Sequence, residues 1–198
     1  MDTQTVSFNV EFLKESARNI ALTHTELSGG EKSRLIKPIL QEAKTTLENA
    51  YRVLSGYARA EKELTPAAEW LIDNFYIIQE QIVQTESDFP KEFQKTVPLL
   101  DQGELKGLPR VYELILNYLT HTDNQTDLQS LIQYIQSYQE VETLRQGEIW
   151  AIPIMIRLIL IEKLSEKSTR LLQRKETRKN IEDIVSELGA DSDREPGK

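Results

Sequence analysis

The sequence predicts an all-α fold, in which a long N-terminal helical hairpin precedes a compact antiparallel bundle, with six to seven helices in total. Apolar residues recur three and four positions apart along nearly all of the 198 residues, which is the spacing of one helix face. Alternating apolar and polar runs bounded by turn dipeptides, the pattern of strands, are almost absent. We therefore expect a hairpin over residues 1–63, a bundle over 64–180 and a mostly disordered acidic tail over 181–198.

The hairpin is predicted from two narrow apolar stripes separated by glycines. The first helix is expected over residues 6–23, and Gly29 and Gly30 then interrupt the pattern. A second, longer helix is expected over residues 31–63. Pro38 falls in its first turns, where the missing N–H costs little.

The bundle is predicted to begin with a third helix over residues 66–86. Thr65 is a favourable N-cap, and Pro66 suits the first helical position. The following segment, residues 90–108, contains prolines and glycines but also many apolar residues. We expect it to be a loop held against the helices, with room for one short helix.

Three further helices complete the predicted bundle. The fourth is expected over residues 109–120, and the fifth opens at a capping box, T-D-L-Q over 126–129, and runs to about 139. A second capping box, T-L-R-Q over 143–146, precedes the sixth helix, which runs to about 179. Pro153 lies inside this last pattern, so the helix either bends there or begins later, near Glu148.

Composition limits the chemistry of the chain. With 24 basic and 32 acidic residues the net charge is −8, so nucleic acid is not an expected partner. The absence of cysteine excludes disulfides, zinc–thiolate sites and a thiol nucleophile. His24 and His121 are the only histidines, which excludes a three-histidine metal site. We expect no catalytic residues, no metal and no cofactor in this chain.

The sequence gives no sign of export or of a membrane span. The N-terminus lacks the basic start and apolar run of a secretory signal. The most apolar stretch, residues 149–161, is too short to cross a bilayer and contains Arg157. We expect a cytoplasmic location, which includes the cytoplasmic face of the inner membrane. The basic stretch over 163–179 either approaches anionic headgroups or a partner, or forms a solvated helix end.

Several single residues are candidates for interaction or for buried polar roles. The two tryptophans, Trp70 and Trp150, could stack on sugar rings, but their helical spacing favours core packing. His121, two residues before Asp123, could be a general base, although a turn histidine is more often structural. The full set of candidates is Trp70, Asp73, Arg110, His121, Glu148, Trp150 and Arg157.

Two of these candidates combine charge with an apolar setting. Glu148 could be a buried functional acid, but a carboxylate early in a helix more often complements the helix dipole. Arg157 lies within the most apolar stripe, and a buried charge is normally paired. We expect its partner to be a carboxylate from the set Glu69, Asp73, Glu113 and Glu148.

A series of motifs in fixed order links the chain to a known family. They are LTPAAEWLIDNFYIIQEQI (64–82), GLPRVY (107–112), HTD (121–123), YQEV (138–141), GEIWAIPI (147–154), RL (157–158) and EKL (162–164). This set resembles the N-terminal segment of the bacterial cyclic β-1,2-glucan synthases. The resemblance covers roughly residues 64–172.

The resemblance implies membership in a large, multidomain inner-membrane system. Such synthases combine a glycosyltransferase that uses UDP-glucose, a cyclising region and a phosphorylase-like region, and the similar segment precedes their membrane spans. No catalytic motif of the family falls within the matching positions. The chain is thus expected to be a non-catalytic helical region that docks other domains of the synthase, or another protein, or that forms a homo-oligomer. The alternatives are a stand-alone helical adaptor and a carbohydrate-binding module that uses Trp70, Trp150, Glu148 and Arg157.

Overall fold

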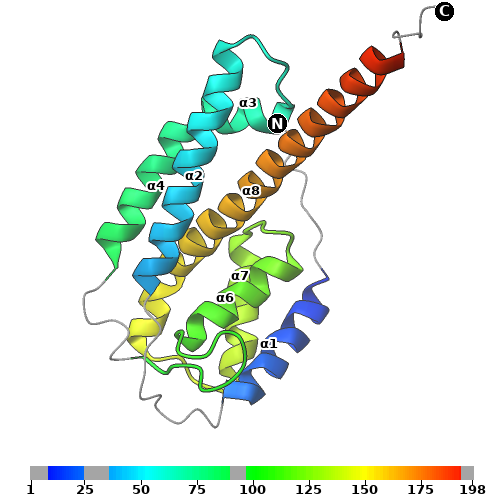
Figure 1. Ribbon diagram of the computed structural model, residues 1–198. Coiled ribbons are helices and arrows are strands. Elements are labelled where there is room, and N and C mark those ends of the chain that lie inside the picture. The colour runs from blue at the N-terminus through cyan, green and yellow to red at the C-terminus, as the bar shows by residue number, and fades with distance from the viewer. Residues whose placement is uncertain (1–8, 25–35, 90–96, 193–198) are drawn as a thin grey trace, which may run out of the picture.

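The computed structural model describes residues 9–24, 36–89 and 97–192, and these residues form seven helices and no strand (Figure 1). This confirms the predicted all-α fold. The helices are α1 (Val10–His24), α2 (Ile36–Arg59), α3 (Pro66–Asp73), α4 (Phe75–Asp88), α6 (Arg110–His121), α7 (Leu128–Gln139) and α8 (Gln146–Ser192).

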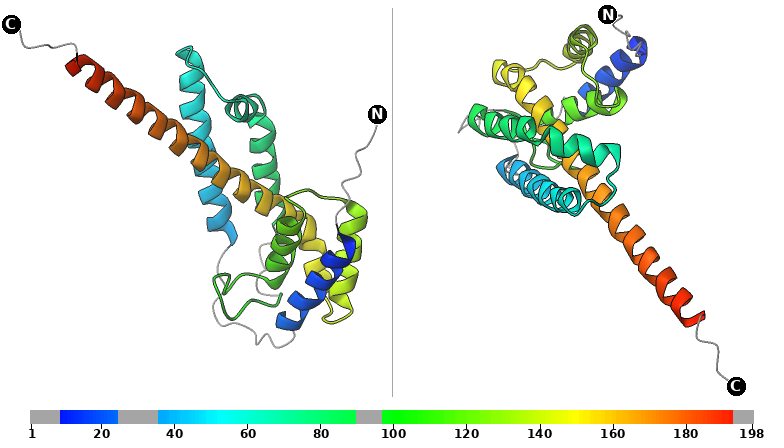
Figure 2. Two further views of the ribbon diagram at one scale, coloured as in Figure 1. Left: turned by 90° about the vertical axis from the view of Figure 1, so that its right-hand side faces the viewer. Right: turned by 90° about the horizontal axis from the view of Figure 1, so that it is seen from above.

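The longest helix, α8, organises the bundle. It has 47 residues and packs against α2, α4 and α6. Figures 1 and 2 show it crossing the molecule diagonally and continuing past the ends of the other helices. Since an α-helix rises about 1.5 Å per residue, α8 is about 70 Å long.

The expected N-terminal hairpin is not observed, because α1 and α2 pack against different helices. The principal neighbours of α1 are α6 and α7, whereas α2 lies against α3, α4 and α8. Fully buried Ala17 and Ala21 allow a close approach of α1 to its neighbours, and Arg18 pairs with Glu140 at 2.7 Å. Residues 25–35, which include the glycine pair, lie outside the described residues.

The expected third helix is two helices, because the chain turns at Asn74. Its Nδ2 donates a hydrogen bond to the Trp70 carbonyl at 2.8 Å, and its backbone has φ −104° and ψ 8°. Asparagine side chains compete with the helical backbone in this way. The predicted start is confirmed, since Thr65 Oγ1 accepts a hydrogen bond from the Ala68 N–H at 3.3 Å.

The described part of the segment before α6, residues 97–108, is a loop held against the helices, as predicted. Leu100 donates its N–H to the Leu108 carbonyl at 2.8 Å, and Gly107 donates to the Leu100 carbonyl at 2.7 Å. Gly107 has φ +84°, a left-handed conformation that glycine adopts without strain. Leu99, Leu100 and Leu108 are buried.

Both α7 and α8 begin later in the chain than the two predicted capping boxes indicate. The N-cap of α7 is Asp127 rather than Thr126, and its carboxylate accepts the Ser130 N–H at 2.7 Å. α8 begins at Gln146 and passes through Pro153, which is exposed, so the later start is not observed. The lost hydrogen bond of Pro153 therefore falls on the side of α8 that faces solvent.

The end of α8 also differs from the expectation. The helix continues to Ser192, so helix covers 181–192, where a mostly disordered tail was expected. The apolar residues Ile181, Ile184, Val185 and Leu188 keep the helical spacing in this stretch, which explains the continuation. Residues 193–198 lie outside the described part of the chain.

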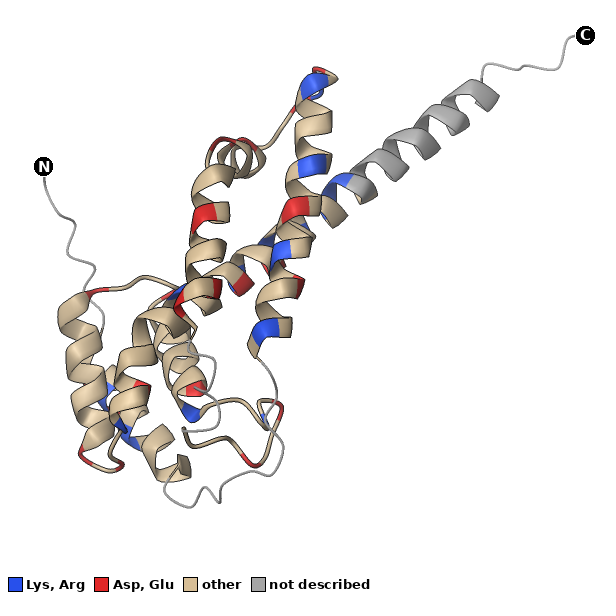
Figure 3. Cartoon of the chain, turned by 90° about the vertical axis from the view of Figure 1, so that its left-hand side faces the viewer, with Lys and Arg blue, Asp and Glu red and all other residues tan. Residues whose placement is uncertain are grey.

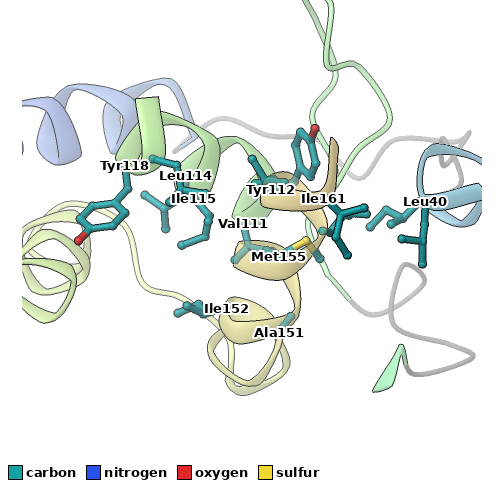
Figure 4. Close-up of a cluster of buried hydrophobic side chains, with 14 of the residues drawn as sticks. Leu40, Val111, Tyr112, Leu114, Ile115, Tyr118, Ala151, Ile152, Met155 and Ile161 are labelled. Carbon is teal, nitrogen blue, oxygen red and sulfur yellow. The ribbon is translucent and has the colours of Figure 1, made fainter. Parts of the chain in front are cut away.

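A continuous core joins three helices and fixes where α6 meets α8. Figure 4 shows Met155 beside Val111 of α6, whereas Ile161 reaches toward Leu40 of α2. All four side chains are buried, and Met155 and Val111 are fully so. This packing holds the first turns of α6 and α8 together, and the buried charges lie at that junction.

Candidate functional site

The junction of α6 and α8 encloses a buried ion pair between two of the sequence candidates. Arg110 is 2% exposed and Glu148 is 0% exposed. Arg110 Nε donates to Glu148 Oε1 at 2.9 Å and Nη2 donates to Oε2 at 3.0 Å, a bidentate geometry. Nη1 donates to Glu142 at 2.7 Å, and Nη2 also donates to the Thr143 carbonyl at 2.9 Å.

The electrostatics of the pair favour the charged guanidinium. Burial alone lowers the pKa of Arg110, but the hydrogen bonds to Glu148 and Glu142 outweigh it, so the pKa is raised above its ordinary value. A buried arginine held by two carboxylates remains a cation at every physiological pH.

Glu148 is buried and lies in the first turn of α8, where a carboxylate complements the helix dipole. It is the third residue of α8, and its Oε2 accepts the backbone N–H of Arg145 at 2.9 Å, which is one half of a capping box. The same carboxylate holds Arg110, so its two oxygens are occupied by cap and ion pair. A fully buried acid used in this way anchors the start of α8.

A second buried polar group centres on His24, which the sequence analysis did not single out as a site candidate. His24 is 2% exposed, and its Nδ1 lies 2.9 Å from the Tyr138 hydroxyl. Its Nε2 lies 3.0 Å from Glu113 Oε2. His24 continues the buried stripe of Ala17 and Ala21, so helical periodicity alone could have identified it.

Buried tyrosines extend the polar interior along the seam of α6 and α7. The Tyr118 hydroxyl lies 2.8 Å from Ser130 Oγ, and Tyr134 donates to Asn117 Oδ1 at 2.7 Å. Burial raises the pKa of Tyr134 and of Tyr138 above the ordinary tyrosine value. The hydroxyls of Tyr134 and Tyr138 therefore stay protonated, and they act as hydrogen-bonding groups between the helices.

The two tryptophans lie at the surface, so the preference for core packing was wrong. Trp70 is 53% exposed and Trp150 is 71% exposed. In each helix smaller neighbours occupy the core face, such as Ala68 in α3 and Ala151 in α8. The structure does not bring the two indoles into one site. Trp150 lies in the first turns of α8, whereas Trp70 of α3 lies beside Leu164 and Leu171, much further along α8.

The other candidates also lie apart from the buried pair. Arg157 bonds to Asp88, at the end of α4, and to none of the four carboxylates expected for it. The reason is topological, since the break at Asn74 directs α4 along α8. Asp73 is exposed, and His121 is exposed with its ring edge-on to Phe12 at 4.9 Å.

The Arg157–Asp88 pair should make stability depend on pH. The hydrogen bond from Arg157 is the largest cause of a lowered pKa for Asp88. A lowered folded-state pKa stabilises the protein above the unfolded value, about 3.9, and this contribution is lost as pH falls through the folded value. We expect Asp88→Asn to lower the urea midpoint near neutral pH, and this difference from the wild type to shrink as the pH falls through the folded-state pKa of Asp88. A difference that does not change with pH would contradict this account.

Two observations bear on metals and membranes. In the described part of the chain, no group of three or more acidic or histidine side chains is placed to hold a metal ion. None of the helices in residues 9–24, 36–89 and 97–192 combines the length and apolar character of a membrane crossing.

Comparison with known proteins supports the family resemblance. No family model matches the chain. Over 181 residues, 91% of its length, the chain is 28% identical to the cyclic β-(1,2)-glucan synthase NdvB of Rhizobium meliloti (strain 1021). The resemblance to a cyclic β-1,2-glucan synthase is confirmed. The match spans only 6% of NdvB, and it extends well beyond the residues 64–172 that carried the motifs.

Proposed function

We propose that this chain is a non-catalytic helical region of a cyclic β-1,2-glucan synthase-like protein, and that it docks the other domains of that protein. The observation that carries the proposal is an exposed apolar surface on the first turns of α8. Ile149 is 43% exposed, Trp150 is 71% exposed, and Pro153 is exposed beside them. Positions three and four apart share one helix face, so the three form a single platform. We call them the α8 platform.

Two buried interactions hold the first turn of α8, which carries the α8 platform. They are the cap of the Arg145 N–H by Glu148 and the ion pair between Arg110 and Glu148. Exposed tryptophan on a preorganised surface is a common anchor of protein interfaces, because its large face is desolvated at low entropic cost. The acid and base groups of the interior bond to one another, which supports a structural role for them.

The comparison supports a setting within a larger protein. The similar segment is 6% of NdvB, so most of that protein lies outside it. By analogy with the family, we place the region at the cytoplasmic face of the inner membrane. A stand-alone adaptor would use the same α8 platform for a separate polypeptide.

A carbohydrate-binding role is the second candidate, and the exposure of both tryptophans favours it. An open indole face can stack on the apolar face of a sugar ring. Trp70 and Trp150 are available for this in the structure, whereas a buried tryptophan would not be.

Binding to the remainder of a synthase tests the docking proposal. The purified chain is mixed with detergent-solubilised NdvB from which the matching segment has been deleted, and binding is measured by interferometry. We expect Trp150→Ala to weaken binding by at least about tenfold, since interface tryptophans are frequent hot spots. Leu128→Ala, at a 73% exposed site on α7, is the matched control and should leave binding unchanged.

The wild-type chain and its tryptophan variants also distinguish the docking role from the carbohydrate-binding role. If cyclic β-1,2-glucan quenches the tryptophan fluorescence of the chain and Trp150→Ala or Trp70→Ala removes the effect, the carbohydrate role is favoured. Binding to the truncated synthase without any response to glucan supports docking. If neither is observed at micromolar concentration, both proposals fail.

A further inference from the structure

A groove of about 500 Å³ lies between α3 and α8, away from the α8 platform. Of the residues that line it, Leu71 and Ser168 are buried, whereas Trp70 is 53% exposed. Three cations complete one side of the lining: Lys167, Arg170 and Arg174. None of the lining residues is acidic, although the chain as a whole carries a net charge of −8.

The cations of the groove belong to a row along one side of α8. With 3.6 residues per turn, four basic side chains start within an arc of about 60° of the helix circumference. We call them the basic row: Lys163, Lys167, Arg170 and Arg174. At a rise of about 1.5 Å per residue the row is about 16 Å long. Along α2, by contrast, acidic and basic residues are interspersed (Figure 3).

The charges that line the groove are not used within the described part of the chain. The side chains of Lys167, Arg170 and Arg174 form no ion pair, hydrogen bond or ring contact with any described residue. Other cations of the same helix are used, since Lys163 pairs with Glu166 at 3.5 Å and Lys175 donates to a backbone carbonyl of the α2–α3 connection at 2.8 Å. Three charges therefore remain available to a ligand, beside an apolar surface.

We propose that the α3–α8 groove binds an amphipathic helix of a partner polypeptide, with the carboxylates of that helix along the basic row. A groove between two helices suits this mode of recognition, in which the bound helix inserts apolar side chains three, four and seven positions apart. Trp70 is the expected anchor, because tryptophan is frequent among the residues that dominate binding energy. The cations at 167, 170 and 174 match carboxylates of the same spacing, which gives the contact its complementary charge.

Charge and shape favour a polypeptide over a lipid surface. Exposed Glu69 precedes Trp70 on α3, and exposed Glu166 precedes Lys167 on α8. A bilayer of anionic headgroups would therefore meet these carboxylates together with the basic row, and they would oppose its binding. The groove is concave, and a single helix about 10 Å across contacts a narrower strip than a bilayer does.

This site goes beyond the proposed function, since it adds a second surface and states the chemistry of its partner. The groove does not share a residue with the α8 platform, which lies at positions 149–153. Trp150→Ala should therefore leave binding at the groove unchanged, so the two surfaces can fail independently.

Selection of peptides on the intact 198-residue chain tests the proposal. Random peptides of about 16 residues, enough for four helical turns, are displayed on phage. They are first depleted on the Lys167→Glu, Arg170→Glu variant, which retains the α8 platform, and then selected on the wild type. We expect the surviving peptides to carry Asp or Glu three, four and seven positions apart beside a stripe of apolar residues.

A selected peptide then provides an affinity, measured by fluorescence anisotropy of a labelled copy. Lys167→Glu with Arg170→Glu should weaken binding by at least about tenfold, because like charges then face each other. Lys37→Glu with Arg52→Glu makes the same change of charge at exposed positions of α2, and this matched control should bind as the wild type does. An equal loss in both variants would show an effect of net charge and would overturn the proposal.

Tryptophan fluorescence reports on the groove itself. In a Trp150→Phe background, the emission of Trp70 should shift to the blue as the peptide saturates, because the bound helix covers the indole. No surviving peptide, or survivors without the carboxylate pattern, would overturn the proposal. If none survives and the wild type but not the charge-reversed variant binds phosphatidylglycerol vesicles, the groove is assigned to lipid instead. Loss of peptide binding at the groove together with intact binding to truncated NdvB would overturn this site alone and retain the docking role.

Discussion

Replacing Glu148 by alanine is expected to lower the free energy of unfolding by about 3–5 kcal/mol, the usual effect of removing one partner of a buried ion pair. Arg110, at 2% exposure, would lose its bidentate acceptor while remaining buried. The Arg145 N–H would lose its cap at the same time. Urea denaturation followed by circular dichroism at 222 nm, a helix-sensitive wavelength, measures the change.

A double variant separates the net contribution of the ion pair to the free energy of unfolding from the cost of leaving one buried charge unpaired. Arg110→Met combined with Glu148→Leu should cost less than Glu148→Ala by itself, because no buried charge is left unpaired. Arg18→Ala, which breaks the exposed pair with Glu140, is the surface control and should have a small effect. If Glu148→Ala behaves like this control, Glu148 does not anchor the start of α8.

Helical periodicity predicted most elements because each presents a single apolar stripe to the core. The buried residues of α2 keep this spacing from Ile36 to Leu54, and the predicted α6 and α7 differ from the observed helices by one or two residues. Periodicity failed at Asn74, where a side-chain hydrogen bond ends a helix although the apolar pattern continues through Phe75. A local interaction of this kind leaves no trace in the spacing.

The candidate site was predicted only in part, for a related reason. Ala151, Ile152, Ile154 and Met155 surround Trp150 with apolar neighbours in sequence, so no single face of this part of α8 stands out. Which side becomes the core is decided by α6 and α2, which pack against it. The charge pairing of Arg110 and the partner of Arg157 likewise depend on how separate helices meet. His24 is different, because its place on the α1 stripe was visible in the sequence.

The packing at the α6–α8 junction should be as important to stability as its charges. Met155 is fully buried beside Val111, so Met155→Ala is expected to lower the free energy of unfolding by about 2–5 kcal/mol through lost burial and the cavity that remains. Trp150→Ala removes a larger side chain from the same helix, but at 71% exposure it should change stability by no more than about 0.5 kcal/mol.

The contrast between these two variants bears on function as well as on folding. A tryptophan that can be removed without loss of stability, but whose removal weakens binding to the synthase, must act at the surface of the folded protein. If Trp150→Ala destabilised the chain as much as Met155→Ala, the indole would belong to the core and could not serve as an anchor. Denaturant unfolding of the two variants, measured beside the binding assay, decides between these outcomes. We expect a stable Trp150→Ala protein, because the cap, the buried ion pair and Met155 hold α8 without the α8 platform.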